Sequence, residues 1–262
     1  MGVLNVTPDS FSDGGRYRSL DRALRRAETM VAEGAALVDV GGESTRPGAQ
    51  AVSEAEELDR VVPTIEAINS RCDVAISVDT STPAVMREAV AAGAVLINDV
   101  RALRRSGAIS AAAATTAAVC LMHMQGEPAT MQSRPAYTDP VTEVVNFLNS
   151  RIDAAVAAGI DRSRLLVDPG FGFGKTLDHN LVLLSQVSRF ATLAPLLIGV
   201  SRKSMLGALT GRGIEDRLAA GTAATALALQ SGACIVRAHD VAATVDVAKV
   251  VAAVQEASGE PS

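Results

Sequence analysis

Hydrophobic positions recur along the chain in eight similar units. Each unit is a short apolar run that ends in polar or glycine-rich residues and is followed by an amphipathic segment. Continuous apolar runs of this length are typical of strands buried on both faces. The predicted strands are Val3–Val6, Leu37–Val40, Val74–Val78, Val95–Ile97, Val119–Met122, Leu165–Val167, Leu196–Val200 and Ile235–Val236.

The segments between these runs have helical periodicity. They are Leu20–Glu33, Glu54–Ile68, Pro83–Ala91, Ala108–Ala118, Val141–Ala158, Asn180–Phe190, Ile214–Gln230 and Ala242–Ala257. Thr82 stands before Pro83 as an N-cap does before a proline in the first turn. Glycines follow four of the segments, as C-terminal caps do: Gly34, Gly93, Gly159 and Gly232.

This alternation predicts an α/β fold with parallel strands and right-handed crossovers. Eight units in 262 residues fit a single (β/α)8 TIM barrel, which typically has about 250 residues. An open, doubly wound sheet has the same periodicity and remains the alternative. We expect one domain over residues 1–257 and a frayed tail over residues 258–262.

Composition narrows the function. The net charge of −5, without a clustered basic surface, disfavours nucleic-acid binding. Three widely spaced cysteines, Cys72, Cys120 and Cys234, form neither a disulfide framework nor a zinc motif, and the last two are expected to be buried in apolar runs. No apolar stretch reaches the roughly 18 residues that span a membrane, and no signal peptide precedes the first strand. We expect a cytoplasmic protein that binds neither nucleic acid nor membrane.

Every predicted strand is followed by polar residues. A single Asp or Asn in this position is more often a turn or helix cap. In a barrel, however, the C-terminal ends of all strands converge on the mouth where such enzymes bind their substrates. The sequence therefore predicts a ring of polar side chains that forms an active site.

The loop Gly170–Thr176 superficially resembles a phosphate-binding loop. Such a loop needs a glycine five residues before Gly174, where this chain has Pro169, so the motif fails. Two interpretations stay open. The loop brings its backbone and Phe173 close to a flat ligand, or it is a flexible strand-to-helix turn.

Taken together, the strand-end segments closely resemble bacterial dihydropteroate synthases. The resemblance runs through the whole chain in order and rests on Leu4–Gly15, Gly41–Gly48, Ser77–Thr80, Asn98–Asp99, Leu121–Met124, Asp168–Lys175, Ser201–Ser204 and Arg237–Asp240. Family members usually carry a short segment ahead of the first strand, and without it we expect lower thermal stability and unchanged chemistry.

The resemblance implies a transferase of folate biosynthesis. In this reaction 6-hydroxymethyl-7,8-dihydropterin pyrophosphate condenses with p-aminobenzoate by an SN1-like substitution, giving 7,8-dihydropteroate and pyrophosphate. The resemblance also implies Mg2+, a homodimer and inhibition by sulfonamides.

It further implies a role for individual residues. The pterin would be bound by Asp79, Asn98, Met122, Asp168, Phe173 and Lys203. The pyrophosphate would be bound by Asn5, Thr45, Arg46, Arg237 and His239, with Asn5 also contacting Mg2+. The p-aminobenzoate pocket would be formed by Phe11, Thr45, Arg46, Pro47, Phe173, Lys203 and Ser204. The catalytic residues would be Asn5, Asp79, Lys203 and Arg237.

Three other functions are compatible with parts of this pattern. A pterin-ring methyltransferase domain shares the barrel but has no reason to carry Ser44–Gly48 or Ser201–Ser204. An aldolase-type barrel would use Lys203 as a Schiff base. A catalytically silent homologue would bind pterin without turnover, which the intact set of polar strand-end residues disfavours.

Overall fold

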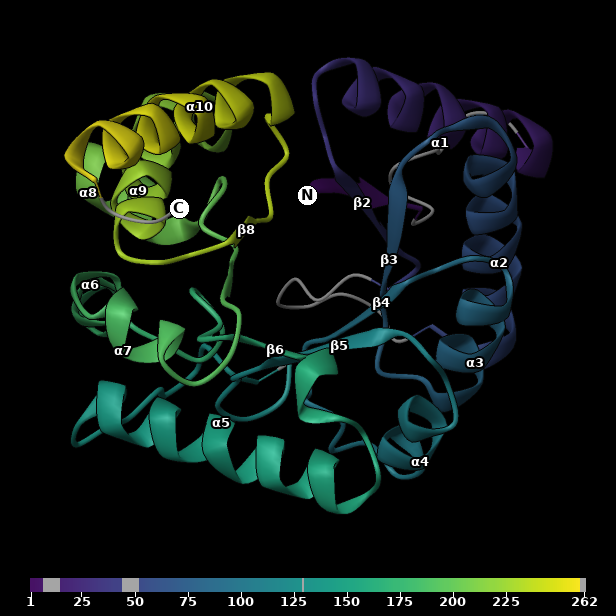
Figure 1. Ribbon diagram of the computed structural model, residues 1–262, viewed down its shortest axis with the longest axis horizontal. Coiled ribbons are helices and arrows are strands. Elements are labelled where there is room, and N and C mark those ends of the chain that lie inside the picture. Colours follow the sequence, from purple (N-terminus) through teal and green to yellow (C-terminus); the bar gives the residue numbers. More distant parts are fainter. Residues whose placement is uncertain (7–14, 44–51, 129, 260–262) are drawn as a thin grey trace.

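The computed structural model of the chain describes residues 1–6, 15–43, 52–128 and 130–259, and the side chains of all of these except 15–18. Strands and helices alternate along it in the predicted order. Figure 1 shows the strands around the centre of the molecule and the helices outside them. In the part of the chain that the structure describes, no helix combines the length and apolar character needed to cross a membrane.

The strands form two parallel ladders that follow the order of the sequence. The first contains β1 (Gly2–Asn5), β2 (Leu37–Gly41), β3 (Ala75–Asp79), β4 (Leu96–Asp99), β5 (Ala118–Met122) and β6 (Leu165–Asp168). The second contains β7 (Leu197–Ile198) and β8 (Ile235–Val236). The predicted α/β class with parallel strands is therefore confirmed.

Isolated contacts link the two ladders at both ends. A parallel bridge joins Val167 to Leu196, and another joins Gly2 to Ala238. The Val3 N–H donates to the Ala238 carbonyl at 3.0 Å, and the Ala238 N–H donates to the Met1 carbonyl at 2.9 Å. The first strand thus lies beside the segment that follows the last one. A doubly wound sheet, whose strand order reverses at a switch point, does not have this arrangement.

The outer layer consists of α1 (Gly15–Ala32), α2 (Glu54–Arg71), α3 (Pro83–Ala91), α4 (Ala108–Ala113), α5 (Pro140–Ala157), α6 (Leu177–Ser185), α7 (Val187–Ala191), α8 (Ser204–Thr210), α9 (Leu218–Gln230) and α10 (Val241–Ser258). Short 3-10 turns lie at Arg162–Arg164 and Ile214–Asp216. The four predicted cap glycines all have positive φ, between 93° and 119°, which confirms them as helix C-caps.

Three helix predictions were wrong in extent, and one helix was not predicted. The expected helix Ile214–Gln230 begins as a 3-10 turn, and α9 starts only at Leu218. The expected helix Asn180–Phe190 is interrupted at Gln186, where φ is −122° and ψ is 25°, and forms α6 and α7. The alanine-rich segment was expected to be helical up to Ala118, but α4 ends at Ala113 because Ala118 begins β5 and pairs with Leu96. Helix α8 lies in a segment that had been assigned to a strand-end loop and was not predicted.

Thr82 occupies the predicted N-cap position of α3, but its hydroxyl does not cap the helix. It donates to Glu57 Oε2 at 2.6 Å, and the Thr80 hydroxyl donates to Oε1 of the same carboxylate at 2.5 Å. Glu57 lies on α2 and is buried, and burial raises its pKa while the two threonines oppose that shift. These bonds satisfy the buried carboxylate and tie α2 to the start of α3.

The cysteine prediction was half right. All three thiols are free, and Cys120 is buried in β5 as expected. Cys234 is exposed, because it stands before β8 begins and outside the core.

Candidate active site

The register of the first four strands places the expected polar residues in one row. Asn5 is paired with Gly41, Gly41 with Asp79, and Asp79 with Asn98. Residues paired in register project to the same face of a sheet. Gly41 has no side chain, so a gap lies between the side chains of Asn5 and Asp79. A β-carbon placed on Gly41 would lie 3.7 Å from both Asn5 Oδ1 and Asp79 Oδ2.

Arg237, which follows β8, connects Asp79 of this row to Asp39 of β2. Its Nε donates to Asp39 Oδ2 at 2.6 Å, and its Nη2 donates to Asp79 Oδ2 at 2.8 Å. The Asn98 amide also donates to Asp39 Oδ2, at 3.2 Å. One guanidinium therefore joins β8 to β2 and β3, and two residues predicted to act on different parts of the substrate share one network.

Sequence reasoning missed Asp39. It is fully buried in β2, two residues before Gly41, and was taken as one position of an apolar strand. Its signal in the sequence was the single charge inside that run. Among the described residues its Oδ1 has no hydrogen-bond partner, nor has the hydroxyl of Ser77, its partner in register on β3. A buried carboxylate needs a paired charge, and Arg237 supplies it.

Burial raises the pKa of Asp79 to about 7. Arg237 lowers that pKa, whereas the charges of Asp39 and Asp99 raise it further. For Arg237 itself, burial lowers the pKa, but Asp39 and Asp79 outweigh burial and hold it above its ordinary value. Arg237 is therefore a permanent cation, and Asp79 changes its charge near neutral pH.

Asp168 and Lys203 come from later units of the fold, at the end of β6 and after β7. Asp168, at the end of β6, is buried, and its Oδ1 accepts the Gly170 N–H at 2.7 Å. Among the described residues Oδ2 has no hydrogen-bond partner, so it is available to a ligand. Burial raises the pKa of Asp168, and the Gly170 N–H, Lys203 and Lys175 oppose that shift. Burial likewise lowers the pKa of Lys203 to about 8, and Asp168 raises it.

The ring of Phe173 forms an apolar wall of the site. The Lys203 ammonium lies 4.2 Å from the centroid of this ring, within the range of a cation–π contact. Phe173 packs on a buried cluster to which Met122 of β5 belongs, with Val100, Met124 and Met131. The structure thus brings together Asp168, Lys203 and Phe173, three of the residues expected to bind the pterin.

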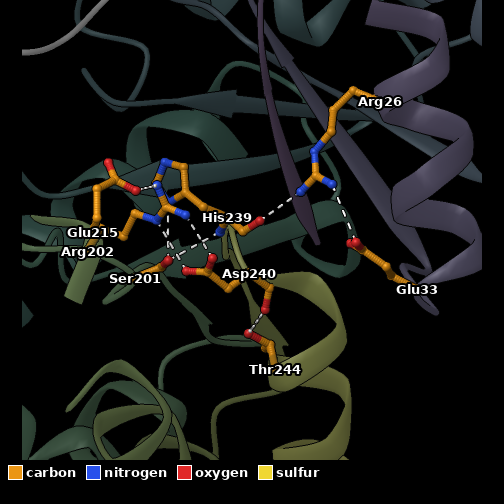
Figure 2. Close-up of polar contacts among 8 residues, drawn as sticks. All are labelled: Arg26, Glu33, Ser201, Arg202, Glu215, His239, Asp240 and Thr244. Carbon is orange, nitrogen blue, oxygen red and sulfur yellow. Dashed lines mark hydrogen bonds and ion pairs between the residues drawn. The ribbon is translucent and has the colours of Figure 1, made fainter. Parts of the chain in front are cut away.

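His239 follows β8 in the cluster drawn in Figure 2. Its Nδ1 lies 3.1 Å from the Ser201 hydroxyl, which also accepts the His239 backbone N–H at 3.2 Å. The His239 carbonyl accepts from Arg26 Nη2 at 2.9 Å. Burial lowers the pKa of His239 to about 4, and the charges of Arg237 and Arg202 act in the same direction. The imidazole is therefore neutral at pH 7.

An ion pair ties the loop after β7 to the loop after β8 (Figure 2). Arg202 donates to Asp240 through Nε at 3.2 Å and Nη2 at 2.8 Å, and its Nη1 donates to Glu215 at 3.2 Å. Arg202 has a φ of +58°, which is unfavourable for a side-chain-bearing residue, so this bidentate pair holds a strained backbone. The neighbouring Lys203 and His239 are positioned by it. Neither Arg202 nor Asp240 was predicted to have a role.

The residues around Gly41 fit a divalent cation that is shared with a substrate. The Asn5 amide oxygen and the Asp79 carboxylate are hard oxygen donors of the kind that Mg2+ prefers. Within the described ranges, no group of three or more His, Cys, Asp or Glu side chains is placed to form a metal site. Mg2+ typically keeps only one or two protein ligands and takes the rest from water and phosphate, so the Asn5 and Asp79 oxygens would be enough to hold it.

Part of the predicted p-aminobenzoate pocket lies outside the described residues, namely Phe11, Thr45, Arg46 and Pro47. Ser204, another predicted member, is the first residue of α8 and directly follows Lys203.

These features define an α/β enzyme with a charged site at the C-terminal ends of its strands. The chain belongs to the pterin binding enzyme family, which it matches over residues 1–239. A dihydropteroate synthase of Escherichia coli K12 is 52% identical over 254 residues, covering 97% of this chain and 90% of that protein.

Solved structures of similar proteins agree. The Yersinia pestis dihydropteroate synthase, in complex with a sulfonamide drug, is 52% identical, with a TM-score of 0.93 over 98% of this chain and 94% of that one. The Xanthomonas albilineans dihydropteroate synthase with 4-aminobenzoic acid is 52% identical, with a TM-score of 0.92 over 97% of this chain and 92% of that one.

The raised pKa of Asp79 predicts how the free energy of unfolding depends on pH. Because the folded-state pKa of about 7 exceeds the ordinary 3.8, the native state binds this proton more tightly than the unfolded state between these values. The stability that the proton contributes is present below about pH 4 and is lost as the pH rises through 7. Asp79→Asn removes the group, so raising the pH from 5 to 8 should destabilise the wild type more than the variant.

The difference should reach at most about 1.4 kcal/mol per pH unit. Urea unfolding followed by circular dichroism at several pH values measures it. Asp153→Asn, at an exposed position on α5, is the matched control and should follow the wild type. Parallel pH profiles of the wild type and Asp79→Asn would contradict the prediction.

Proposed function

We propose that this chain is a dihydropteroate synthase. The observation that carries the proposal is the network of Arg237 with Asp39, Asp79 and Asn98 at the strand ends of a chain whose near-full-length relatives are dihydropteroate synthases. In the reaction, the bond between the pterin methylene and the pyrophosphate oxygen breaks, and both electrons leave with pyrophosphate. The amine nitrogen of p-aminobenzoate then bonds to the methylene and loses a proton to solvent.

The pterin edge presents a ring N–H and an amino group side by side. The Asp168 carboxylate accepts both, with Asn98 on the same edge, and the Lys203 ammonium donates to the ring carbonyl. This pairing gives geometric specificity and compensates the burial of the charges. Met122 and Phe173 contact the flat faces of the ring.

The departing pyrophosphate is strongly anionic, and the methylene left behind is a cation delocalised into the pterin. Asp79, beside the ring, stabilises the positive charge when ionised. Arg237 and neutral His239 bind the pyrophosphate. The family resemblance also assigns Thr45 and Arg46, of the Gly41–Gly48 segment, to this group. No covalent nucleophile is required, because preorganised charges at both ends lower the barrier. Asn5 would hold Mg2+, which would supply positive charge to offset part of the leaving-group charge.

The second substrate is an anionic arylamine. The family resemblance assigns its carboxylate to Ser204 at the start of α8 and its ring to Phe173 and Lys203. It also assigns Phe11, Thr45, Arg46 and Pro47 to this substrate, and these four lie outside the described residues. The amine is weakly basic and already neutral at pH 7, so no general base is needed to activate it. The bound 4-aminobenzoic acid of the Xanthomonas enzyme and the sulfonamide of the Yersinia enzyme support p-aminobenzoate as the second substrate.

The proposal is tested by an assay of the purified protein. With pterin pyrophosphate, p-aminobenzoate and Mg2+ it should form dihydropteroate and pyrophosphate in equal amounts, and neither product when one substrate is omitted. Chelation of Mg2+ with EDTA should slow the reaction. Mass spectrometry measures dihydropteroate, and a phosphate assay coupled to added pyrophosphatase measures pyrophosphate. Binding of the pterin substrate without any dihydropteroate would identify a silent homologue, and trapping of Lys203 by borohydride with a carbonyl substrate would identify an aldolase.

Asp168→Asn should lose most of its affinity for the pterin while remaining folded. Removing one partner from a buried, hydrogen-bonded charge pair costs roughly 2–5 kcal/mol, or at least about 30-fold in affinity. Isothermal titration with pterin pyrophosphate measures the loss, and circular dichroism checks the fold. Asp178→Asn, at an exposed position on α6, is the control and should bind like the wild type. Near-normal affinity of Asp168→Asn would remove this assignment.

We also propose that the protein is a cytoplasmic homodimer that pairs through α9 and α10. These helices lie side by side in Figure 1. They expose large apolar side chains, Leu227 of α9 at 59%, Val250 of α10 at 64% and Val254 of α10 at 55%. Large exposed apolar side chains on two neighbouring helices favour an interface there.

The double variant Leu227→Glu with Val250→Glu should be monomeric, because it places charges in the proposed interface. Light scattering coupled to gel filtration gives the mass in solution. Val156→Glu, at an exposed apolar position on α5, should leave the mass unchanged. A wild-type monomer, or a dimer in the double variant, would overturn this surface.

A further inference from the structure

Lys175 is a buried lysine that the proposed reaction does not use, and burial lowers its pKa to about 7 while Asp168 raises it. It closes the loop that resembles a phosphate-binding loop in sequence, and it is only 3% exposed. Its ammonium donates to the Gly170 carbonyl at 2.8 Å and to the Phe173 carbonyl at 3.0 Å. It also donates to His123 Nδ1 at 2.9 Å. All three N–H groups of the ammonium therefore have a partner.

Two other carbonyls of the loop accept hydrogen bonds from side chains outside it. Tyr137 donates its hydroxyl to the Gly174 carbonyl at 2.8 Å, and the Gln132 amide donates to the Gly172 carbonyl. In a phosphate-binding loop, backbone N–H groups surround an anion. Here backbone carbonyls surround a cation of the same chain. Because the loop directs carbonyl oxygens toward the lysine, it is not a phosphate site. Its role is to hold the residues of the substrate site that it carries.

The loop is also pressed against the segment that follows β5. Gly170 has a φ of +69°, and a β-carbon there would lie 1.9 Å from the His123 carbonyl oxygen. Gly174 has a φ of +64°, and a β-carbon there would lie 2.5 Å from the Gln125 carbonyl oxygen. Only glycine permits both the backbone conformation and the close approach. These close contacts fix the position of the loop against the segment that follows β5.

His123 belongs to this support. Burial and the adjacent Lys175 lower its pKa to about 2, so its imidazole is neutral and accepts through Nδ1. Its ring lies edge-on to Phe147 of α5, with 4.8 Å between the centroids. The histidine at the end of β5 thus connects the ammonium to the outer helices.

Two residues of the loop, Gly170 and Phe173, contact residues of the proposed substrate site. The Phe173 ring at its far side faces the Lys203 ammonium. The Gly170 N–H at its start donates to Asp168 Oδ1. Asp168 itself belongs to β6 and is held by that strand, whereas the backbone of Phe173 belongs to the loop and its ring packs on the cluster that contains Met122. A change in the loop must therefore displace Phe173 more than Asp168.

We propose that Lys175 is a positioning residue, which holds the Gly170–Gly174 loop so that Phe173 forms the wall shared by the pterin and the arylamine. The inference rests on the proposed function in assigning those ligands. It predicts that loss of the ammonium impairs use of the arylamine more than use of the pterin.

Lys175→Met tests this in steady-state kinetics with both substrates. The KM for p-aminobenzoate should rise by about tenfold or more, and that for pterin pyrophosphate by about threefold or less, because each 1.4 kcal/mol of lost binding is tenfold. Arg87→Met, which removes a cation at an exposed position on α3, should have wild-type constants. A merely structural lysine would lower the melting temperature and leave both KM values unchanged, or change them equally, and either result overturns the proposal.

Hydrogen exchange of the ligand-free protein tests the support independently of activity. Peptides that cover residues 170–174 should exchange faster in Lys175→Met, by about tenfold, and peptides from β2 should not. If the wild type forms no dihydropteroate, the proposed function fails while the exchange experiment still judges the loop. Should Lys175→Met not fold, Tyr137→Phe removes one outer bond and should shift the arylamine KM and the loop exchange in the same direction, by less. Wild-type behaviour of the folded variants would overturn the proposal.

Discussion

Arg237 lies between two buried carboxylates, and the rest of the site depends on this arrangement. Charges removed from water must be paired, because an isolated buried ion costs several kcal/mol. Asp39 supplies one partner from inside β2, and Asp79 supplies the other from the end of β3. Since Arg237 follows β8, the pairing also holds the last strand to the second and third. The same contacts therefore stabilise the ring of strands and concentrate charge where the substrates would bind.

Two other basic residues near the site are held by different kinds of partner. Arg202 forms a bidentate pair with Asp240 and thereby links the loops that carry Lys203 and His239. Lys175 takes backbone carbonyls in place of a carboxylate and organises the loop of Phe173. Around the mouth, cations thus bind carboxylates, carbonyls or, for Lys203, an aromatic face. Each arrangement leaves the neighbouring residue in a defined position, which is what an electrostatic mechanism requires.

Much of the fold was accessible from the sequence. The predicted strands and the glycine caps were placed correctly, because apolar runs and left-handed glycines are local signals. The wrong helix predictions also rested on local patterns in the sequence. The segment Asn180–Phe190 kept its helical pattern through Gln186, although the chain turns there, and α8 begins within a motif whose polar residues concealed a helix. Asp39 was passed over because a strand pattern cannot show that a charge inside it has a partner about 200 residues away.

By itself, the sequence determined the alternation of strands and helices, the identity of the polar residues at the strand ends and the family that they resemble. These follow from short-range periodicity and from motifs that are contiguous in the chain. Only the tertiary structure decided which of those residues meet. It placed Asp79 and Asn98 on the network of Arg237, gave Lys175 carbonyl partners instead of a phosphate, and turned the hydroxyl of Thr82 toward Glu57. The physical reason is that a buried charge is stable only beside its partner, and such partners lie on different strands and loops.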